Sequence, residues 1–205
     1  FTAQLRQQGI FATSGVAGVV TAFAVARNDA RGQIVGHYNS PTPPPQIAAQ
    51  VAAARLAGDS VISGGVIVGE SSDPACNLIG VNLKTVLPQN FATERPTTTE
   101  LEAALNNGVT PLALSGINPT GTSVVRSITS RSTHLGVQNY SVLDTANVTV
   151  PDYIADDLQA YFAVIYAGTK LGADSTDGTA PRIAKVIKPS MIRDELISKL
   201  KLYEQ

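Results

Sequence analysis

Residues 95–114 read RPTTTELEAALNNGVTPLAL, and no other stretch says more about the fold of this chain. Thr97 and Glu100 have the spacing of a capping box, in which each side chain satisfies a free backbone N–H at the start of a helix. The helix would carry one apolar face, made by Leu101, Ala104 and Leu105. Asn107-Gly108 supplies a left-handed stop. The stretch therefore predicts a short helix that ends just before an apolar strand.

Two strands are expected after this helix. Val109–Leu114 is apolar but contains Pro111, which cannot donate to a sheet ladder and so favours an edge strand. Turn residues follow at Gly116, Asn118-Pro119 and Gly121. Ser123–Ser130 is then a β-branched run with one embedded arginine, typical of a second strand.

Helical and strand patterns alternate toward the N-terminus. The periodicity of Ile10–Val25 fits either a strand pair or a buried helix. The other expected elements are strands at Gln33–Tyr38, Ser60–Gly69 and Leu78–Val86 and an alanine-rich helix at Gln46–Ala57, ended by Gly58. This alternation favours a mixed α/β fold, with a β-sheet packed against several helices.

The C-terminal part is predicted to be helical. Tyr140–Val150 is rich in threonine and valine and is expected to be extended. Pro151 would then open the longest helix, from about residue 151 to 171, followed by a loop at Ala173–Pro181. The expected apolar face of the long helix comprises Ile154, Leu158, Tyr161, Phe162 and Ile165. A final helix would carry Ile192, Leu196, Leu200 and Tyr203 on one side.

Charged residues are scarce. They make up 15% of the 205 residues, against roughly 25% in average soluble domains. A neutral surface suits a subunit that its neighbours cover, because interface cores are depleted of charge; a weakly charged monomer is the alternative. The net charge of −1 gives no electrostatic footprint for nucleic acid or an anionic membrane. No apolar run has the length of a membrane span.

The two ends of the chain look cut. The sequence begins at Phe1 without a starting methionine or a signal peptide, and it ends at Gln205 inside an amphipathic pattern without a cap. We therefore expect a fragment of a longer protein. Cys76 is the only cysteine, so no internal disulfide is possible, which is compatible with a reducing cytosol.

Several ordered motifs resemble the tail sheath proteins of contractile bacteriophages, especially Mu-like ones. An "ER" pair stands at Glu94-Arg95, "LNNGV" at Leu105–Val109 and "VRSITS" at Val125–Ser130. Asp152–Leu158 is similar to the family's "DYVxDDL" helix start, and Lys188–Leu196 to its "PSxIRxEL" helix. Tyr38-Asn39-Ser40 matches more weakly. Ser130 departs from the pattern, which has a second threonine there.

The resemblance implies a structural subunit without catalytic activity or cofactors. Such subunits form hexameric rings that stack helically around a tail tube and contract to drive it through the host envelope. Terminal strands of each subunit extend into the sheets of its neighbours. The implied partners are other copies of the chain, the tail tube protein, and baseplate and tail terminator proteins, in a virion tail assembled in the bacterial host cytoplasm. An R-type bacteriocin or a type VI secretion system would use a similar sheath. Residues 1–148 would form the sheath α/β core domain, and residues 149–205 would begin a C-terminal sheath subdomain.

Few patterns in this sequence indicate a catalytic site. Only His37 and His134 could serve as a base, and no Gly-x-Ser-x-Gly elbow is present, so an α/β hydrolase is kept only as the alternative of another class. Cys76 is more typical of a small buried side chain than of a nucleophile. Gly64–Gly69 lacks the Gly-Lys-Ser/Thr of a phosphate loop. Asp174–Gly178 lacks the glutamate of a calcium loop, because Lys185 stands there. We therefore predict no catalytic, cofactor or metal residues.

Opposite charges form two blocks near the C-terminus. The acidic block contains Asp144, Asp152, Asp156, Asp157, Asp174 and Asp177. The basic block contains Arg182, Lys185, Lys188, Arg193, Lys199 and Lys201. One hypothesis is that the blocks face each other across a subunit boundary, or that the basic block faces an acidic tail tube. The interface residues would then be Asp152, Asp156, Asp157, Arg182, Lys185 and Lys188. Solvated faces, or contacts within one subunit, are the alternative.

Overall fold

The computed structural model describes residues 8–63, 78–115, 121–172 and 186–203, of which 56–63 are described as backbone only. The chain divides into two compact units, Phe1–Tyr153 and Ile154–Gln205. The domain boundary predicted from the sequence, between residues 148 and 149, stays a prediction. The predicted fold class is confirmed, because a five-stranded sheet packs against helices in a mixed α/β arrangement.

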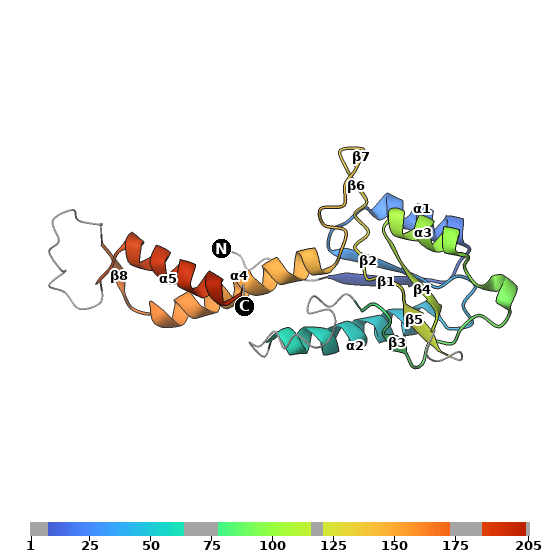
Figure 1. The fold of residues 1–205 in the computed structure, drawn as a ribbon, viewed down its shortest axis with the longest axis horizontal. Helices are drawn as coiled ribbons and strands as arrows, with labels where there is room; N and C mark the ends of the chain where they lie inside the picture. The colour runs from blue at the N-terminus through green and yellow to red at the C-terminus, as the bar shows by residue number, and fades with distance from the viewer. Residues whose placement is uncertain (1–7, 64–77, 116–120, 173–185, 204–205) are drawn as a thin grey trace. The chain divides into compact units, whose positions relative to one another are not determined.

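The first unit is built around this sheet (Figure 1). Its strands lie in the order β1 (Gly9–Thr13), β2 (Gly32–Gly36), β4 (Val109–Leu114), β5 (Thr122–Val124) and β3 (Asn82–Leu83). β1, β2 and β4 are parallel, whereas β5 is antiparallel to both of its neighbours. Helices α1 (Ala17–Arg27) and α3 (Thr98–Asn106) cover one face, and α2 (Pro44–Ser63) covers the other. A single 3-10 turn, η1 (Ala92–Glu94), precedes α3.

Each face of the sheet buries its own apolar cluster. On β2, Val35 packs in the cluster that contains Ile47 and Val51 of α2. Its neighbour Ile34 belongs to the other cluster, with Val20 of α1 and Ala104 of α3. Successive strand residues point to opposite faces, so a strand covered by helices on both sides buries all of its side chains. This accounts for the complete burial of β2. The polar one in β2, Gln33, is satisfied by donating to Thr110 Oγ1 at 3.1 Å and to Ser127 Oγ at 2.9 Å.

The helix predicted at residues 97–106 is confirmed with its capping box. The backbone N–H of Glu100 donates to Thr97 Oγ1 at 3.3 Å, and Glu100 Oε2 accepts from the Thr97 N–H at 2.8 Å. The hydrogen bond from the Thr97 backbone lowers the pKa of Glu100. Gly108 then adopts a φ of +76°, which ends the helix and starts β4.

The edge position predicted for Val109–Leu114 is wrong, because β4 lies between β2 and β5. The register explains how Pro111 is tolerated there. β4 pairs with β2 only as far as Pro111, opposite Gly36, and with β5 only from Leu112 onward. The proline therefore lies at the point where β4 stops pairing with β2 and begins pairing with β5. Its carbonyl accepts a hydrogen bond from the Val125 N–H at 3.0 Å.

The strand predicted at Ser123–Ser130 is largely wrong. β5 ends at Val124, and the rest of the run makes only one isolated bridge, between Ile128 and Asp144. Side-chain hydrogen bonds supplement the scattered backbone bonds of this run. Thr110 Oγ1 accepts from the Ile128 N–H at 3.0 Å and donates to the Ile128 carbonyl at 3.1 Å. Local β-propensity was therefore overruled by polar tertiary contacts.

The N-terminal predictions hold in part. Ile10–Val25 contains one strand and one helix, β1 and α1, and so matches neither the strand pair nor the single buried helix that the periodicity allowed. The predicted helix at Gln46–Ala57 is confirmed, but it continues through Gly58 to Ser63. A single glycine inside a helix costs only about 1 kcal/mol, which does not compel an end. The strand predicted at Ser60–Gly69 is thus wrong for its first four residues, and the rest lies outside the described residues.

The other predicted strands are also shorter than expected. The strand predicted at Gln33–Tyr38 is confirmed as β2 but ends two residues earlier, at Gly36, and Leu78–Val86 shrinks to the two residues of β3. Two short hairpin strands, β6 (Thr133–His134) and β7 (Val137–Gln138), were not predicted. Both pair in the antiparallel sense across a two-residue loop.

The long C-terminal helix is confirmed with shifted ends, as α4 (Ala146–Ile165). The extended structure expected up to Val150 is wrong, since the carbonyls of Asp144 and Thr145 accept the first helical N–H groups. Pro151 lies inside the helix rather than at its start.

The second unit adds β8 (Lys170–Leu171), parallel to β9 (Val186–Ile187), and the final helix α5 (Pro189–Leu202), which was predicted. The loop predicted at Ala173–Pro181 lies outside the described residues. None of the helices in the described part of the chain combines the length and apolar character needed to cross a bilayer.

Candidate functional site

Asp152, the first predicted interface residue, pairs within its own chain. Its carboxylate accepts two hydrogen bonds from the Arg31 guanidinium, at 2.6 and 2.9 Å. This bidentate pair joins the loop before β2 to α4 within the first unit. The hydrogen bond to Asp152 raises the pKa of Arg31.

Asp157 links the acidic block to the basic block inside the second unit. It accepts a hydrogen bond from the Tyr203 hydroxyl and lies 3.0 Å from Lys199 Nζ. The Tyr203 hydrogen bond, and then that of Lys199, lower the pKa of Asp157. Tyr161 of α4 likewise donates to Glu195 of α5. These contacts hold α4 and α5 antiparallel, so the alternative of contacts within one subunit applies to Asp157.

The structure describes two of the other four predicted interface residues. Asp156 is exposed on α4, and Lys188 is the half-buried residue that precedes α5. Arg182 and Lys185 lie outside the described residues, as do Cys76, Gly64–Gly69 and Asp174–Gly178. An interface role for the six residues stays a prediction.

Arg126 forms an ion pair that the sequence analysis did not predict. Its Nε and Nη2 donate to the two carboxylate oxygens of Asp144 at 2.8 and 2.7 Å. This hydrogen bonding raises the pKa of Arg126. The pair fastens the irregular segment after β5 to the turn that leads into α4, next to the bridge between Ile128 and Asp144.

A double-mutant cycle with Arg126→Met and Asp144→Asn is expected to give a coupling of about 1 kcal/mol in the free energy of unfolding, falling in high salt. This coupling energy is at the upper end of the range for partly exposed ion pairs, because the arginine makes two parallel hydrogen bonds to the carboxylate. Arg193 and Asp194, which are both largely exposed, form the matched control and should show almost no coupling. Equal couplings for the two pairs would contradict this assignment.

Neither histidine stands in a catalytic arrangement in the described part of the chain. His37 is fully buried, and its two ring nitrogens have no hydrogen-bond partner among the described residues. Burial lowers its pKa to about 4. His134 is exposed, with Nδ1 2.7 Å from Arg131 Nη2. Because arginine only donates, His134 Nδ1 accepts here and the ring proton is on Nε2. No group of three or more potential metal ligands occurs among the described residues.

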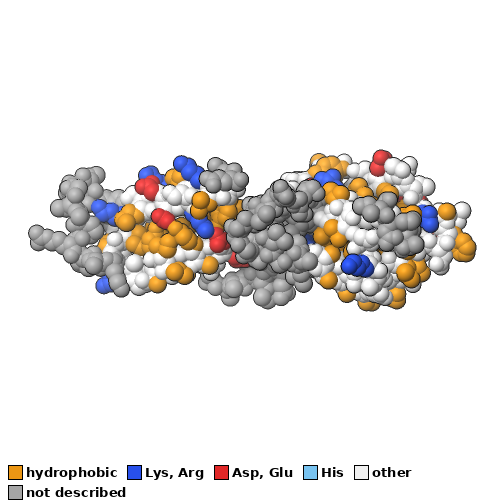
Figure 2. All heavy atoms as spheres, turned by 60° about the horizontal axis from the view of Figure 1, so that its bottom comes forward, with side chains coloured by type: hydrophobic (Ala, Val, Ile, Leu, Met, Phe, Trp, Pro, Cys, Tyr) orange, Lys and Arg blue, Asp and Glu red, His pale blue; other side chains and the backbone are white. Residues whose placement is uncertain are grey.

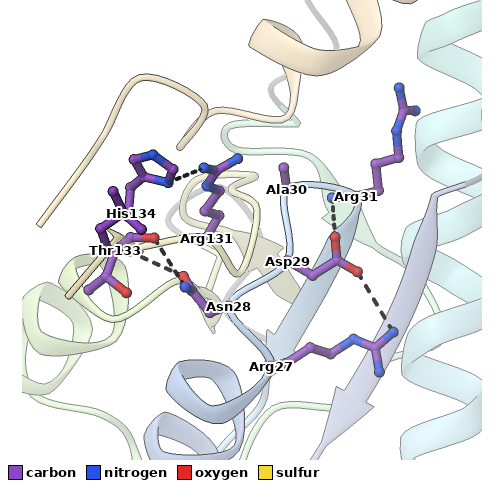
Figure 3. A pocket seen from close by; sticks show the side chains of 9 residues that line it. Arg27, Asn28, Asp29, Ala30, Arg31, Arg131, Thr133 and His134 are labelled. Atoms are coloured by element: carbon purple, nitrogen blue, oxygen red, sulfur yellow. Dashed lines mark hydrogen bonds and ion pairs between the residues drawn. The ribbon is translucent and has the colours of Figure 1, made fainter. Parts of the chain in front are cut away.

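A polar pocket of about 790 Å³ lies where α1 ends beside the β6–β7 hairpin (Figure 3). Asn28 organises it. Its Oδ1 accepts from the backbone N–H groups of Ser132 and Thr133 at 3.2 Å, and its Nδ2 donates to the Thr133 carbonyl at 3.0 Å. These bonds fix the base of the hairpin to the end of α1. Arg131 and His134 project from the hairpin side of the pocket.

A second pocket, of about 470 Å³, lies along β1 and is apolar. We call it the β1 pocket; its main side chains are Phe11, Val19, Phe23, Pro44, Pro45 and Ala48. It is formed between α1, α2 and β1, which pairs on one side only among the described strands. Phe11, Val19 and Phe23 are exposed large apolar residues.

The second unit also exposes much apolar surface, as Figure 2 shows on its left-hand part. Among the described residues, neither α4 nor α5 contains a buried residue. The exposed large apolar residues of this unit are Val164, Ile165, Leu171, Met191, Ile197, Leu200 and Leu202. The described residues of this unit thus leave a large part of its apolar side chains uncovered.

No protein-family model matches this chain, and no curated protein matches it either. The candidate site therefore rests on the geometry above: two exposed apolar surfaces and a hairpin with a fixed base. Sequence reasoning missed both pockets and the hairpin. The signal that could have revealed the hairpin is Leu135-Gly136, since a glycine in the second position is typical of a two-residue turn.

Proposed function

We propose that this chain is a structural subunit of a contractile tail sheath of the phage type, which assembles with copies of itself around a tube. The observation that carries the proposal is the exposed apolar surface of both units, on a chain with few charges. Extended apolar patches on a soluble protein mark interaction sites. The proposal is further supported by the ordered motifs at Leu105–Val109, Asp152–Leu158 and Lys188–Leu196.

The β1 edge also fits this role. A strand with a neighbour on one side only has unpaired N–H and C=O groups, which an extended segment of another chain can pair with. Such strand exchange would keep subunits linked while their units shift as rigid bodies during contraction. The tail tube, baseplate and terminator proteins are the further partners that this function requires. A bacteriocin or secretion-system sheath would present the same surfaces.

Sedimentation of the full-length protein over a wide concentration range tests this function. We expect species much larger than one chain, whose fraction rises with concentration. Because the exposed surfaces are neutral and apolar, raising the salt concentration should weaken assembly only slightly. A single-chain species at every concentration would contradict the proposal.

A further inference from the structure

The polar pocket at the end of α1 gathers charged side chains on a chain that has few of them (Figure 3). Its charged lining residues are Arg27, Asp29, Arg31 and Arg131. Three cations face one anion here, whereas the whole chain carries a net charge of −1. The guanidinium group of arginine binds carboxylates and phosphates through parallel N–H donors. The lining therefore favours an anionic occupant.

The hairpin side of the pocket presents donors that the chain does not use. Arg131 donates from Nη2 to His134 Nδ1 and makes no ion pair with any described residue. The ring proton of His134 is on Nε2, which makes no hydrogen bond to a described residue either. His134 is exposed and Arg131 is half-buried, so a ligand in the pocket can reach both side chains.

The α1 side of the pocket presents a further set of donors, on Arg27. Its guanidinium lies 3.9 Å from the Asp29 carboxylate, beyond hydrogen-bond distance, and its Cζ lies 4.2 Å from the centroid of the Phe11 ring. Stacking on the ring fixes the plane of the guanidinium but leaves the N–H groups at its edge free. A fixed group loses little conformational entropy when it binds. Arg31 adds only charge, because Asp152 already occupies one edge of its guanidinium.

The charges of the pocket favour an acidic peptide over a nucleic acid. A nucleic acid carries a charge on every phosphate and needs an extended basic surface. Asp29 would repel such a backbone, whereas a peptide with spaced carboxylates can place a neutral residue there. The cavity of about 790 Å³ has room for more than a single ion. Leu135 also lines the pocket and is 91% exposed, so it offers an apolar contact to the neutral residue.

The acidic residues of this chain are poor candidates for the occupant. Asp144, Asp152 and Asp157 form ion pairs within the chain. Glu195 accepts a hydrogen bond from Tyr161. A second copy would have to break these contacts to offer the same carboxylates, so a different protein is the better source.

We propose that the polar pocket binds an acidic segment of a different protein, with one carboxylate on Arg131 and His134 and another on Arg27. This inference does not rest on the proposed function. The polar pocket shares no lining residue with the apolar β1 pocket and is not part of the exposed apolar surfaces. It adds a second kind of partner, which the chain recognises by charge.

Peptide binding to the full-length protein tests this inference. The probe is a short fluorescent peptide in which glutamate and leucine alternate, and its control has glutamine in place of glutamate. Fluorescence anisotropy should show binding of the acidic peptide only. Salt at about 1 M should weaken this binding strongly, because exposed charge pairs are screened. A single-stranded oligonucleotide with the same number of charges should compete less well than the unlabelled acidic peptide.

Variants of the lining arginines locate the binding site. Arg131→Gln and Arg27→Gln should each lower the affinity for the acidic peptide by about 10-fold or more, as expected for the loss of a charge-assisted hydrogen bond. Arg95→Gln removes an exposed arginine outside the pocket and is the matched control, so it should leave the affinity unchanged. Arg131→Gln should also leave the melting temperature unchanged, because the only contact it removes is the exposed one to His134.

The outcomes separate this inference from the proposed function. The inference is wrong if neither peptide binds, if both bind alike, if the oligonucleotide competes better, or if Arg131→Gln and Arg27→Gln bind like the wild type. None of these results bears on self-assembly. If the acidic peptide binds through these arginines to a chain that never self-associates, the proposed function is wrong and this inference stands.

Discussion

Replacing Gly108 with alanine is expected to lower the free energy of unfolding by about 3 kcal/mol or more. A methyl group at this position would lie 2.6 Å from the Ser130 carbonyl oxygen, which is backbone and cannot move aside. The φ of +76° adds a conformational cost of about 1–2 kcal/mol for any residue with a Cβ. Overpacking of this kind typically costs about 1–3 kcal/mol beyond that. Chemical denaturation of the two proteins measures the difference.

Gly80 provides the matched control. It has a φ of +74°, but a Cβ there would meet no atom within 4 Å. Gly80→Ala should therefore cost only the conformational part, about 1–2 kcal/mol. If the two variants lose equal stability, the close approach between Gly108 and Ser130 is not present in solution.

The stability of the first unit should fall steeply between about pH 6.5 and pH 4. Burial lowers the pKa of His37 to about 4 in the folded chain, against 6.5 in the unfolded chain. Below pH 6.5 the unfolded chain therefore takes up a proton that the folded chain refuses, and folding is disfavoured as the pH falls. The full contribution is present above pH 6.5. The loss at pH 4 amounts to about 3 kcal/mol for a shift of this size.

His37→Phe and His37→Leu should flatten this part of the pH profile, whatever their effect on stability at pH 8. His134→Gln, at an exposed position, is the control for removing a histidine and should keep the wild-type profile. Denaturation midpoints measured every half pH unit give the slopes. An unchanged slope in both His37 variants would mean that this ring is accessible to protons in the folded chain.

Local signals in the sequence predicted the helices better than the strands. The box formed by Thr97 and Glu100 depends on residues three apart, so it can be read without knowing the fold. The position of Pro111 inside the sheet could not be predicted from the sequence, because it depends on where β4 changes its pairing partner from β2 to β5. The run after Val124 was also unpredictable, since much of its backbone pairing is irregular and Ile128 exchanges both of its backbone hydrogen bonds with the Thr110 side chain.

The candidate site was less predictable than the fold. The acidic and basic blocks were visible as charges, but their partners were not. Arg31 lies 121 residues from Asp152, and no local pattern reports such a separation. Both pockets form between elements that are distant in sequence. The turn of the β6–β7 hairpin was encoded locally, in Leu135-Gly136, so it was the one feature of the site that a local pattern could have revealed.

Electron microscopy of the full-length protein at assembling concentrations tests the proposed function most directly. The account predicts hollow tubes with helical order, in which each copy contacts several others through its apolar surfaces. Discrete particles of a single chain, without any lattice at high protein concentration, would contradict it.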